Sequence, residues 1–304
     1  MSLIASKTKW VLFLSSSSQA EERHIFDLAF GVHCLELAGI LPVDIHIYID
    51  GSNRNQISQC LSIGTNNNYT IKTTSDFFSD NKHNQYENLV LFITGHGGLN
   101  GIEASSPITP YMLLSCIKST PNLNRAILYL GQCYAGTFNY INAGKKTILS
   151  HHSFPSSQPI NDPEIIVVGA TSLHESLSSS TNEKLSKGDL CWLANVFLLH
   201  VFKWISAPVD VDGDGKKTVI DSYKYAGALS NSKNKMLKVT FLGKAIMLHN
   251  LLFAANATYQ ANPTPQNQLN RDALLQQYND AIDLIYVHQE CWILNAIPAQ
   301  SIVF

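Results

Sequence analysis

The sequence predicts a three-layer α/β/α sandwich around a mostly parallel sheet, followed by a helical C-terminal extension. Short runs of β-branched, aromatic and other apolar residues alternate with segments of helical length and period, a pattern typical of parallel βαβ units. Two of the apolar runs break directly into glycines. With 304 residues, the chain is long enough for one large α/β domain and an extension.

Five apolar runs are expected to form the parallel strands, namely 10–15, 44–50, 89–94, 125–130 and 164–170. A helix is expected over 21–37, where apolar residues recur on one face before Gly39 and Pro42 end it. Further helices are expected over 109–119, opened by Pro110, and over 190–205, a long apolar segment.

Two polar segments are expected to be mobile loops. Residues 51–87 are rich in Asn and Ser and carry only a weak strand pattern near 69–72, whereas 143–162 has no apolar period at all. The expected organisation is an α/β domain over 1–221 and a helical extension over 222–304 packed on it.

Composition and charge narrow the possible partners. The net charge of −2 gives no electrostatic reason to expect a nucleic acid or an anionic membrane as partner. Six widely spaced cysteines without a Cys-x-x-Cys pair favour free thiols over disulfides or that type of zinc site. The apolar run 10–14 is shorter than a signal-peptide core, and no segment is expected to be long enough to cross a membrane. We therefore expect a soluble protein without membrane insertion. Its compartment and oligomeric state are left open.

Two strand-ending motifs carry the chemistry: LVLFITGHGG at 89–98 and AILYLGQCYAG at 126–136. If the two strands are neighbours, about 4.8 Å apart, His96 and Cys133 meet beyond their carboxyl ends. The glycines after His96 free backbone N–H groups for an oxyanion. A cysteine nucleophile for acyl transfer is the favoured interpretation; a buried small thiol and a histidine in a turn are the alternative.

In motif order the chain resembles the clan CD cysteine peptidases, which include caspases, legumains and gingipains, and the legumain type fits best. The matching segments are Glu22-Arg23-His24, Ala38 to Pro42, His96-Gly97, Gln132-Cys133, Ala170 to Ser176 and Gly188 to Trp192. The resemblance covers about residues 10–221 and implies a caspase-like fold.

The resemblance implies that Cys133 is the nucleophile and that His96 protonates the leaving amine. It also implies that the backbone N–H groups of Gly97 and Cys133 form the oxyanion hole. The reaction is then peptide-bond hydrolysis or the related transpeptidation through a thioester, without an organic cofactor.

By the same resemblance, the pocket for the residue before the scissile bond uses Arg23, Ser176 and Asp189, with Gln132 beside the cysteine. An arginine and an aspartate in one pocket suit an asparagine side chain. Legumains place a glutamate two residues before the cysteine, where this chain has Gly131. Asn, Asp and basic side chains are therefore all open. For Arg23 and Asp189, the alternative roles are a surface charge and a helix N-cap.

An Asp-rich segment has the spacing of a structural calcium loop. The expected ligands are Asp210, Asp212, Asp214, Lys216 through its carbonyl, Thr218 and Asp221, with Gly215 at the turn. Asp221 replaces the usual glutamate, and a solvated Asp/Gly turn is the alternative. Similar Asp-rich loops occur in microbial caspase-like peptidases, which this segment resembles.

Other functions and features are left open. The chain can be a caspase-like binding module without activity; an α/β hydrolase is disfavoured because the histidine precedes the cysteine. Autocleavage is conceivable in 143–162, at Lys145, Lys146, Asn161 or Asp162, and His151 and His152 are expected to be loop residues. The C-terminal helices either cover the active site or serve as a scaffold.

Overall fold

The computed structural model describes residues 2–144, 162–287 and 289–304. Its centre is a seven-stranded sheet of order β11-β8-β7-β4-β1-β2-β3, in which every neighbouring pair is parallel except β8 and β11. The strands are β1 (Thr8–Leu14), β2 (Ile45–Ile49), β3 (Ile71–Lys72), β4 (Asn88–Thr94), β7 (Arg125–Leu130), β8 (Glu164–Gly169) and β11 (Trp292–Leu294). The five predicted strands are confirmed. Their nearly continuous apolar sequences arise because the central strands are buried on both faces.

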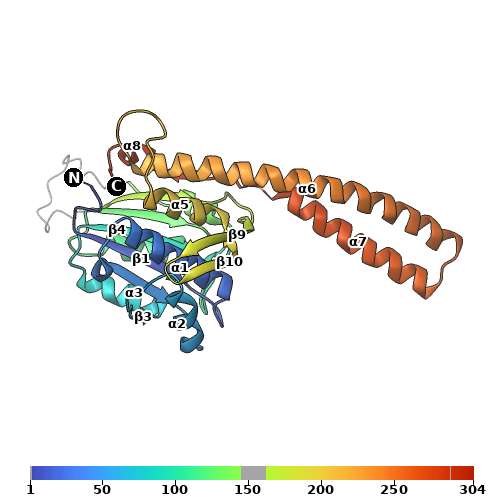
Figure 1. Cartoon of the computed structure of the whole chain (residues 1–304), viewed down its shortest axis with the longest axis horizontal. Helices are drawn as coiled ribbons and strands as arrows, with labels where there is room; N and C mark the ends of the chain where they lie inside the picture. The colour runs from blue at the N-terminus through green and yellow to red at the C-terminus, as the bar shows by residue number, and fades with distance from the viewer. Residues whose placement is uncertain (1, 145–161, 288) are drawn as a thin grey trace, which may run out of the picture.

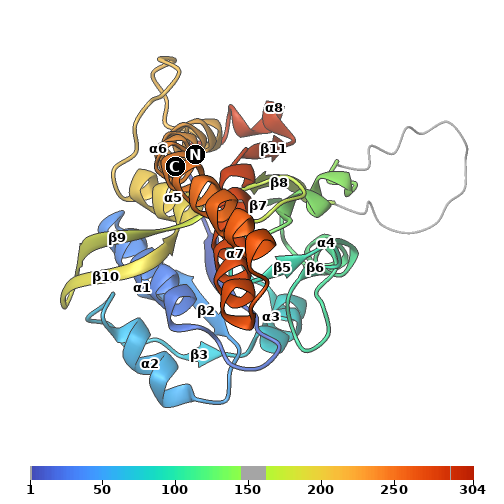
Figure 2. The same ribbon diagram turned by 90° about the vertical axis from the view of Figure 1, so that its right-hand side faces the viewer.

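Helices cover both faces of the sheet (Figures 1 and 2). Alternate side chains of β1 enter separate cores, with Trp10 and Leu12 in one and Val11 and Phe13 in the other. The first core is covered by α1 (Glu22–Leu37), α2 (Arg54–Ser62), α5 (Val196–Ser206) and the start of α6 (Val219–Ala261). The second is covered by α3 (Thr74–Asp80), α4 (Pro110–Lys118) and the 3₁₀ segment Ala135–Tyr140.

Two hairpins and three short helical segments lie in the connections. Two hairpins, β5 (Gly97–Gly98) with β6 (Gly101–Ile102) and β9 (Ser178–Leu185) with β10 (Gly188–Asn195), leave the central sheet. The other short elements are the 3₁₀ segments Pro42–Asp44 and Asn81–His83, and the helix α8 (Ala296–Ala299).

The strand expected near 69–72 is confirmed as β3, but the expectation of a loop over the rest of 51–87 is wrong. The segment forms α2, β3 and α3, and its polar residues cap these helices. The Asn53 side chain accepts a hydrogen bond from the Gln56 N–H, and Thr73 forms a reciprocal capping box with Asp76. In this segment, polar residues mark the N-termini of helices.

The helix expected over 190–205 also needs correction. Its first part is β10, which pairs with β9, and the helix α5 begins only after Asn195. The Asn195 side chain accepts a hydrogen bond from the Leu198 N–H and so caps α5. Buried and exposed residues alternate along β10, whereas most residues of α5 are buried, so the burial pattern changes where the strand gives way to the helix.

The C-terminal extension is mainly a long helical hairpin. α6 has 43 residues, about 65 Å at 1.5 Å per residue, and α7 (Pro265–Tyr286) runs back along it. The hairpin projects from the α/β part as an arm (Figure 1). Its inner face is a small apolar cluster around Ala245, Leu248 and Ala281. Only the beginning of α6 packs on the sheet-covering helices.

The last residues return to the sheet, so a purely helical extension after residue 222 needs correction. β11 pairs antiparallel with β8, with Trp292 opposite Gly169. The Leu3 N–H donates to the Val303 carbonyl at 2.8 Å, which places both termini together. The C-terminus is therefore part of the same core as β1.

The expectation that no segment approaches the length of a membrane span is also wrong. α6 contains an 18-residue window that is apolar enough by length and composition, and only 17% of that window is buried. Its large exposed apolar residues are Met236, Val239, Leu242, Ile246, Met247, Leu251 and Phe253. The contact with α7 therefore leaves much of the apolar surface of α6 uncovered.

Candidate active site

The loops that carry His96 and Cys133 lie against each other at the carboxyl ends of β4 and β7. The two strands are parallel neighbours with Ile93 opposite Leu130, and each reactive residue follows three positions later. The Gly131 N–H donates to the Ile93 carbonyl at 2.8 Å and extends the pairing into the loops. The topology therefore brings the two predicted motifs to one edge of the sheet.

Gly97 sits at the contact between these loops. A Cβ atom at this position would overlap the Cys133 carbonyl oxygen and lie 2.5 Å from Cγ of Gln132. At Gly98, by contrast, a Cβ would meet no atom within 4 Å. Close approach of the two backbones therefore requires glycine at 97 and not at 98.

His96 is held by a carboxylate that the motif analysis did not include. Its Nε2 lies 2.6 Å from Oε1 of Glu21, the residue before α1, and both side chains are about half exposed. The other oxygen, Oε2, accepts a hydrogen bond from Nε of Arg23 at 2.6 Å. The hydrogen bond from Arg23, and next that of His96, lowers the pKa of Glu21 to about 2. Glu21 is therefore ionised at neutral pH and orients the His96 ring.

Cys133 is a partly buried thiol beside the loop that follows β8. Its Sγ accepts a hydrogen bond from the Ser176 backbone N–H at 3.2 Å. Burial raises the pKa of the Cys133 thiol, and the hydrogen bond from Ser176 offsets this only in part. The thiol is therefore mainly protonated at neutral pH, and a nucleophilic role requires a group that takes up its proton.

The turn after Cys133 has an unusual backbone. Tyr134 has φ of 54°, in the left-handed region, and its N–H donates to the His174 carbonyl at 2.8 Å. Two residues later, the Gly136 N–H donates to the Ser172 carbonyl at 3.0 Å. These bonds hold the cysteine turn against the loop 172–176. A non-glycine residue in this region is uncommon and is often found at functional sites.

Of the predicted pocket residues, Arg23 and Ser176 lie next to the cysteine. Nη1 of Arg23 lies 3.2 Å from Oγ of Ser178, two residues after Ser176, and the Arg23 charge also acts on Cys133. The Ser176 hydroxyl accepts a hydrogen bond from Nδ2 of Asn195, which also donates to the Gly131 carbonyl at 2.6 Å. This side of the site is thus built from α1, β9 and the end of β10.

The structure does not bring Asp189 to Arg23. Arg23 contacts Ser178, which pairs with Asn195, whereas Asp189 pairs with Lys184 six residues further along the hairpin. At about 3.3 Å per residue this is about 20 Å, and Asp189 is exposed. The predicted pairing of an arginine and an aspartate in one pocket therefore needs correction.

Gln132 is also placed differently from the expectation. Its side chain is 1% exposed and packs against Gly97, so it does not line an open pocket. Among the described residues its amide has no hydrogen-bond partner. Gln132 is thus a buried support of the contact between the two loops.

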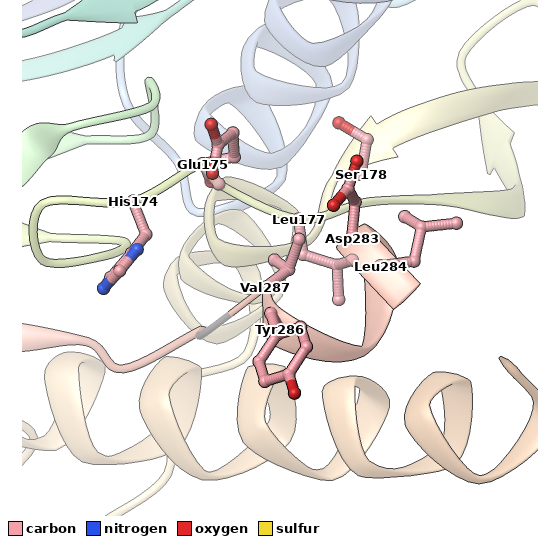
Figure 3. A pocket seen from close by; sticks show the side chains of 9 residues that line it. His174, Glu175, Leu177, Ser178, Asp283, Leu284, Tyr286 and Val287 are labelled. Carbon is pink, nitrogen blue, oxygen red and sulfur yellow. The ribbon is translucent and has the colours of Figure 1, made fainter. Parts of the chain in front are cut away.

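A cavity of about 810 Å³ lies beside the loop that contacts Cys133 (Figure 3). One wall is that loop and the other is the C-terminal end of α7. The lining residues are His174, Glu175, Ser176, Leu177, Ser178, Asp283, Leu284, Tyr286 and Val287. Its walls combine apolar side chains with the carboxylates of Glu175 and Asp283.

The Asp-rich segment forms a tight turn before α6. Carboxylate oxygens of Asp210, Asp212 and Asp214 lie within 4.8 Å of one another. Oδ2 of Asp210 accepts the Gly215 N–H at 2.8 Å, and Gly215 has φ of +83°. The turn glycine of the predicted loop therefore has the backbone that this position requires.

The predicted ligand role of Asp221 needs correction. Its side chain is fully buried, and Oδ2 accepts hydrogen bonds from the Thr218 N–H at 2.9 Å and hydroxyl at 2.7 Å. Oδ1 accepts the Val211 N–H at 2.8 Å. Asp221 and Thr218 are thus engaged as the capping box of α6. Lys216 is exposed in the same turn, and its N–H donates to Oδ1 of Asp214.

Some predictions fall in the interval 145–161, outside the described residues: the candidate cleavage sites Lys145, Lys146 and Asn161, and the pair His151 and His152. Asp162 is described; it is buried and lies 3.1 Å from Nζ of Lys118. All six cysteines are free, as predicted.

Glu21 is the functional candidate that the sequence motifs did not reveal. A glutamate just before a helix is ordinary, because acidic residues favour helix N-termini, and nothing local connects it to His96.

Comparison of the chain with models of known protein families gives no match, and a search of curated proteins finds no relative.

Proposed function

We propose that this protein is a cysteine endopeptidase with a caspase-like fold, in which Cys133 is the nucleophile and His96 its proton-transfer partner. The single observation that carries the proposal is the contact of the His96 and Cys133 loops, with the His96 ring held by an ionised Glu21. The parallel order of β8, β7, β4, β1 and β2 with helices on both faces is compatible with this fold.

The reaction proceeds in two steps. Sγ of Cys133 attacks the scissile carbonyl carbon, its proton passes to His96, and the C–N bond breaks as His96 protonates the leaving amine. Water then attacks the thioester carbonyl and releases the acid and the free thiol. Backbone N–H groups of Gly97 and Cys133 stabilise the oxyanion in both steps.

The residue before the scissile bond is recognised by Arg23 in this proposal. Its Nε is bonded to Glu21 and its Nη1 to Ser178, so Nη2 is the donor available to a substrate. A carboxylate or amide oxygen accepts from a guanidinium, and Asp189 is too distant to accept from an amide NH₂. We therefore propose the preference Asp over Asn, with basic residues disfavoured.

The test is cleavage of a peptide library varied at that position, with wild type, Cys133→Ala and Arg23→Ala compared. We expect wild type to cleave after Asp and Cys133→Ala to cleave no peptide. Arg23→Ala is expected to cleave without a preference for Asp. Mass analysis with an added amine separates hydrolysis from transpeptidation. If the folded wild-type protein cleaves no peptide but binds one in the cavity beside the loop that contacts Cys133, the chain is a binding module instead.

We also propose that Asp210, Asp212 and Asp214 hold a structural calcium ion ahead of α6. Three carboxylates close together suit a hard cation, and Lys224 already neutralises Asp212 in part at 2.7 Å. Calcium calorimetry with wild type and Asp210→Ala tests it: the proposal requires one site that is lost in the variant.

A further inference from the structure

A second group of potential ligands surrounds His96. Glu21, His24 and His96 each direct one ligand atom into a space where the three atoms lie within 4.8 Å of one another. The two imidazole rings stand edge to face with their centroids 5.2 Å apart. Two imidazole nitrogens and one carboxylate oxygen are a donor set that zinc binds, with a fourth position open to water.

His24 provides the independent observation that points to a ligand. Its side chain is about 95% buried, with 5% of the residue exposed, yet its Nε2 has no hydrogen-bond partner among the described residues. A buried polar atom without a partner costs free energy unless it serves a ligand. In α1, His24 lies three residues after Glu21 and so on the same side of the helix start.

The opposite nitrogen of His24 is held by a second layer of residues. Nδ1 lies 3.3 Å from Oγ1 of Thr94 and 3.6 Å from Oδ2 of Asp27. Asp27 is itself buried and fixed by hydrogen bonds from Thr94, Trp192 and the Asn195 N–H. A carboxylate behind one ring nitrogen is the usual support for a histidine that binds metal through the other.

We propose that Glu21, His24 and His96 form a zinc site, and that zinc bound there inhibits the enzyme. Inhibition rests on the proposed function: a His96 nitrogen bound to zinc cannot take the Cys133 proton, and zinc also separates His96 from Glu21. Zinc–nitrogen distances of about 2.0–2.1 Å require ligand atoms about 3.4 Å apart. Because Glu21 and His96 are half exposed, they can move onto the ion while His24 stays fixed.

The primary test is zinc calorimetry, with excess calcium present to occupy the Asp-rich turn. Cobalt substitution adds a visible spectrum that reports a tetrahedral site. We expect one site in wild type, and an affinity at least about tenfold weaker in His24→Gln and in Glu21→Gln. Glu21 is on the surface, so its variant keeps the test valid if His24→Gln does not fold by circular dichroism.

Two controls separate this site from others. His200→Gln removes another partly buried histidine with an unpartnered nitrogen, on α5, and is expected to bind zinc as wild type does. Cys133→Ala is also expected to keep the site, which distinguishes it from thiol coordination. Absence of zinc binding in wild type, or unchanged binding in both ligand variants, overturns the proposal. If zinc binds as expected but no peptide is ever cleaved, the proposed function fails while the metal site stands.

Discussion

At the scale of single residues, the candidate site depends on a carboxylate shared between two partners. One oxygen of Glu21 holds His96 and the other holds Arg23, so the same group links the proposed proton-transfer residue to the proposed specificity residue. Hydrogen bonds from both partners keep its pKa well below the ordinary range. Glu21 therefore stays charged at neutral and mildly acidic pH.

Glu21→Gln tests this role, with Glu22→Gln as the matched control. Glu22, the next residue along the chain, accepts a hydrogen bond from Gln56 of α2 instead. We expect kcat/KM of Glu21→Gln to fall about 100-fold, because the ring of His96 loses its charged anchor. Glu22→Gln is expected to match wild type across the pH profile. Equal effects of the two changes would argue against an orienting role.

Gly97→Ala and Gly98→Ala form a second matched pair. An added methyl group at 97 overlaps the Cys133 backbone, whereas at 98 it meets open space. We expect Gly97→Ala to lower kcat at least about 100-fold, since it displaces the nucleophile loop, and Gly98→Ala to remain close to wild type. Thermal unfolding of both variants shows whether the loss is local. A fully active Gly97→Ala would contradict the proposed loop contact.

At the scale of elements, polar caps decide where helices begin. Asn53, Thr73 and Asn195 each stand directly before a helix and satisfy free N–H groups at its start. Thr218 and Asp221 do the same for α6. These caps explain why a polar segment over 51–87 is helical and why the apolar segment 190–205 divides into strand and helix.

Asp221→Ala is expected to lower the free energy of unfolding by about 3 kcal/mol. The change leaves the buried donors of Thr218, and the partly buried N–H of Val211, without an acceptor. Asp214→Ala, at an exposed position of the same turn, is expected to change it by about 0.5 kcal/mol or less in the presence of a chelator. Urea titrations of both variants measure the difference. Similar small losses would show that the cap is unimportant.

The same cap contributes to the pH dependence of stability. Burial alone raises the pKa of Asp221, but hydrogen bonds from the Thr218 hydroxyl and backbone N–H groups more than offset this, so its pKa lies below the ordinary range. The stabilisation is therefore present above the unfolded-state pKa of about 3.9 and is lost as pH falls through the folded-state value. The difference in unfolding free energy between wild type and Asp221→Ala should accordingly become smaller in acid.

At the scale of the whole molecule, the C-terminal part has two unlike regions. The distal hairpin has only its own small apolar cluster, whereas the final residues enter the main core. Phe304 packs edge to face on Trp204 and contacts Trp10, and its N–H donates to the Lys217 carbonyl at 2.9 Å. The end of the chain thus stabilises the α/β part. The hairpin is an arm inserted in the sequence between the α/β part and these final residues.

Substitution of one phenylalanine in each region tests this difference. Phe304 is 9% exposed and Phe253, on the hairpin, is 72% exposed. We expect Phe304→Ala to cost about 3 kcal/mol of unfolding free energy because it removes a buried ring. Phe253→Ala should change it by about 0.5 kcal/mol or less. A large effect of Phe253→Ala would mean that the exposed face of α6 is covered in solution.

Local patterns in the sequence determined the five main strands, the helix after the first strand, and the positions of His96 and Cys133. Each depends on neighbouring residues: an apolar run long enough for a buried strand, followed by glycine and a reactive side chain. The parallel order then follows from the helices between the strands. The caps at Asn53 and Thr73 were also visible in the sequence, and could have identified α2 and α3.

Only the tertiary structure decided which distant residues meet. Glu21 and His96, far apart in the sequence, form a hydrogen bond. Asp189 lies along the β9–β10 hairpin, far from Arg23, and β11 near the C-terminus pairs with β8. No periodic pattern in the sequence predicts these contacts, because they depend on how the helices pack on the sheet and on the length of each connection. The sequence determined which chemistry is available; the packing decided which carboxylate serves the histidine.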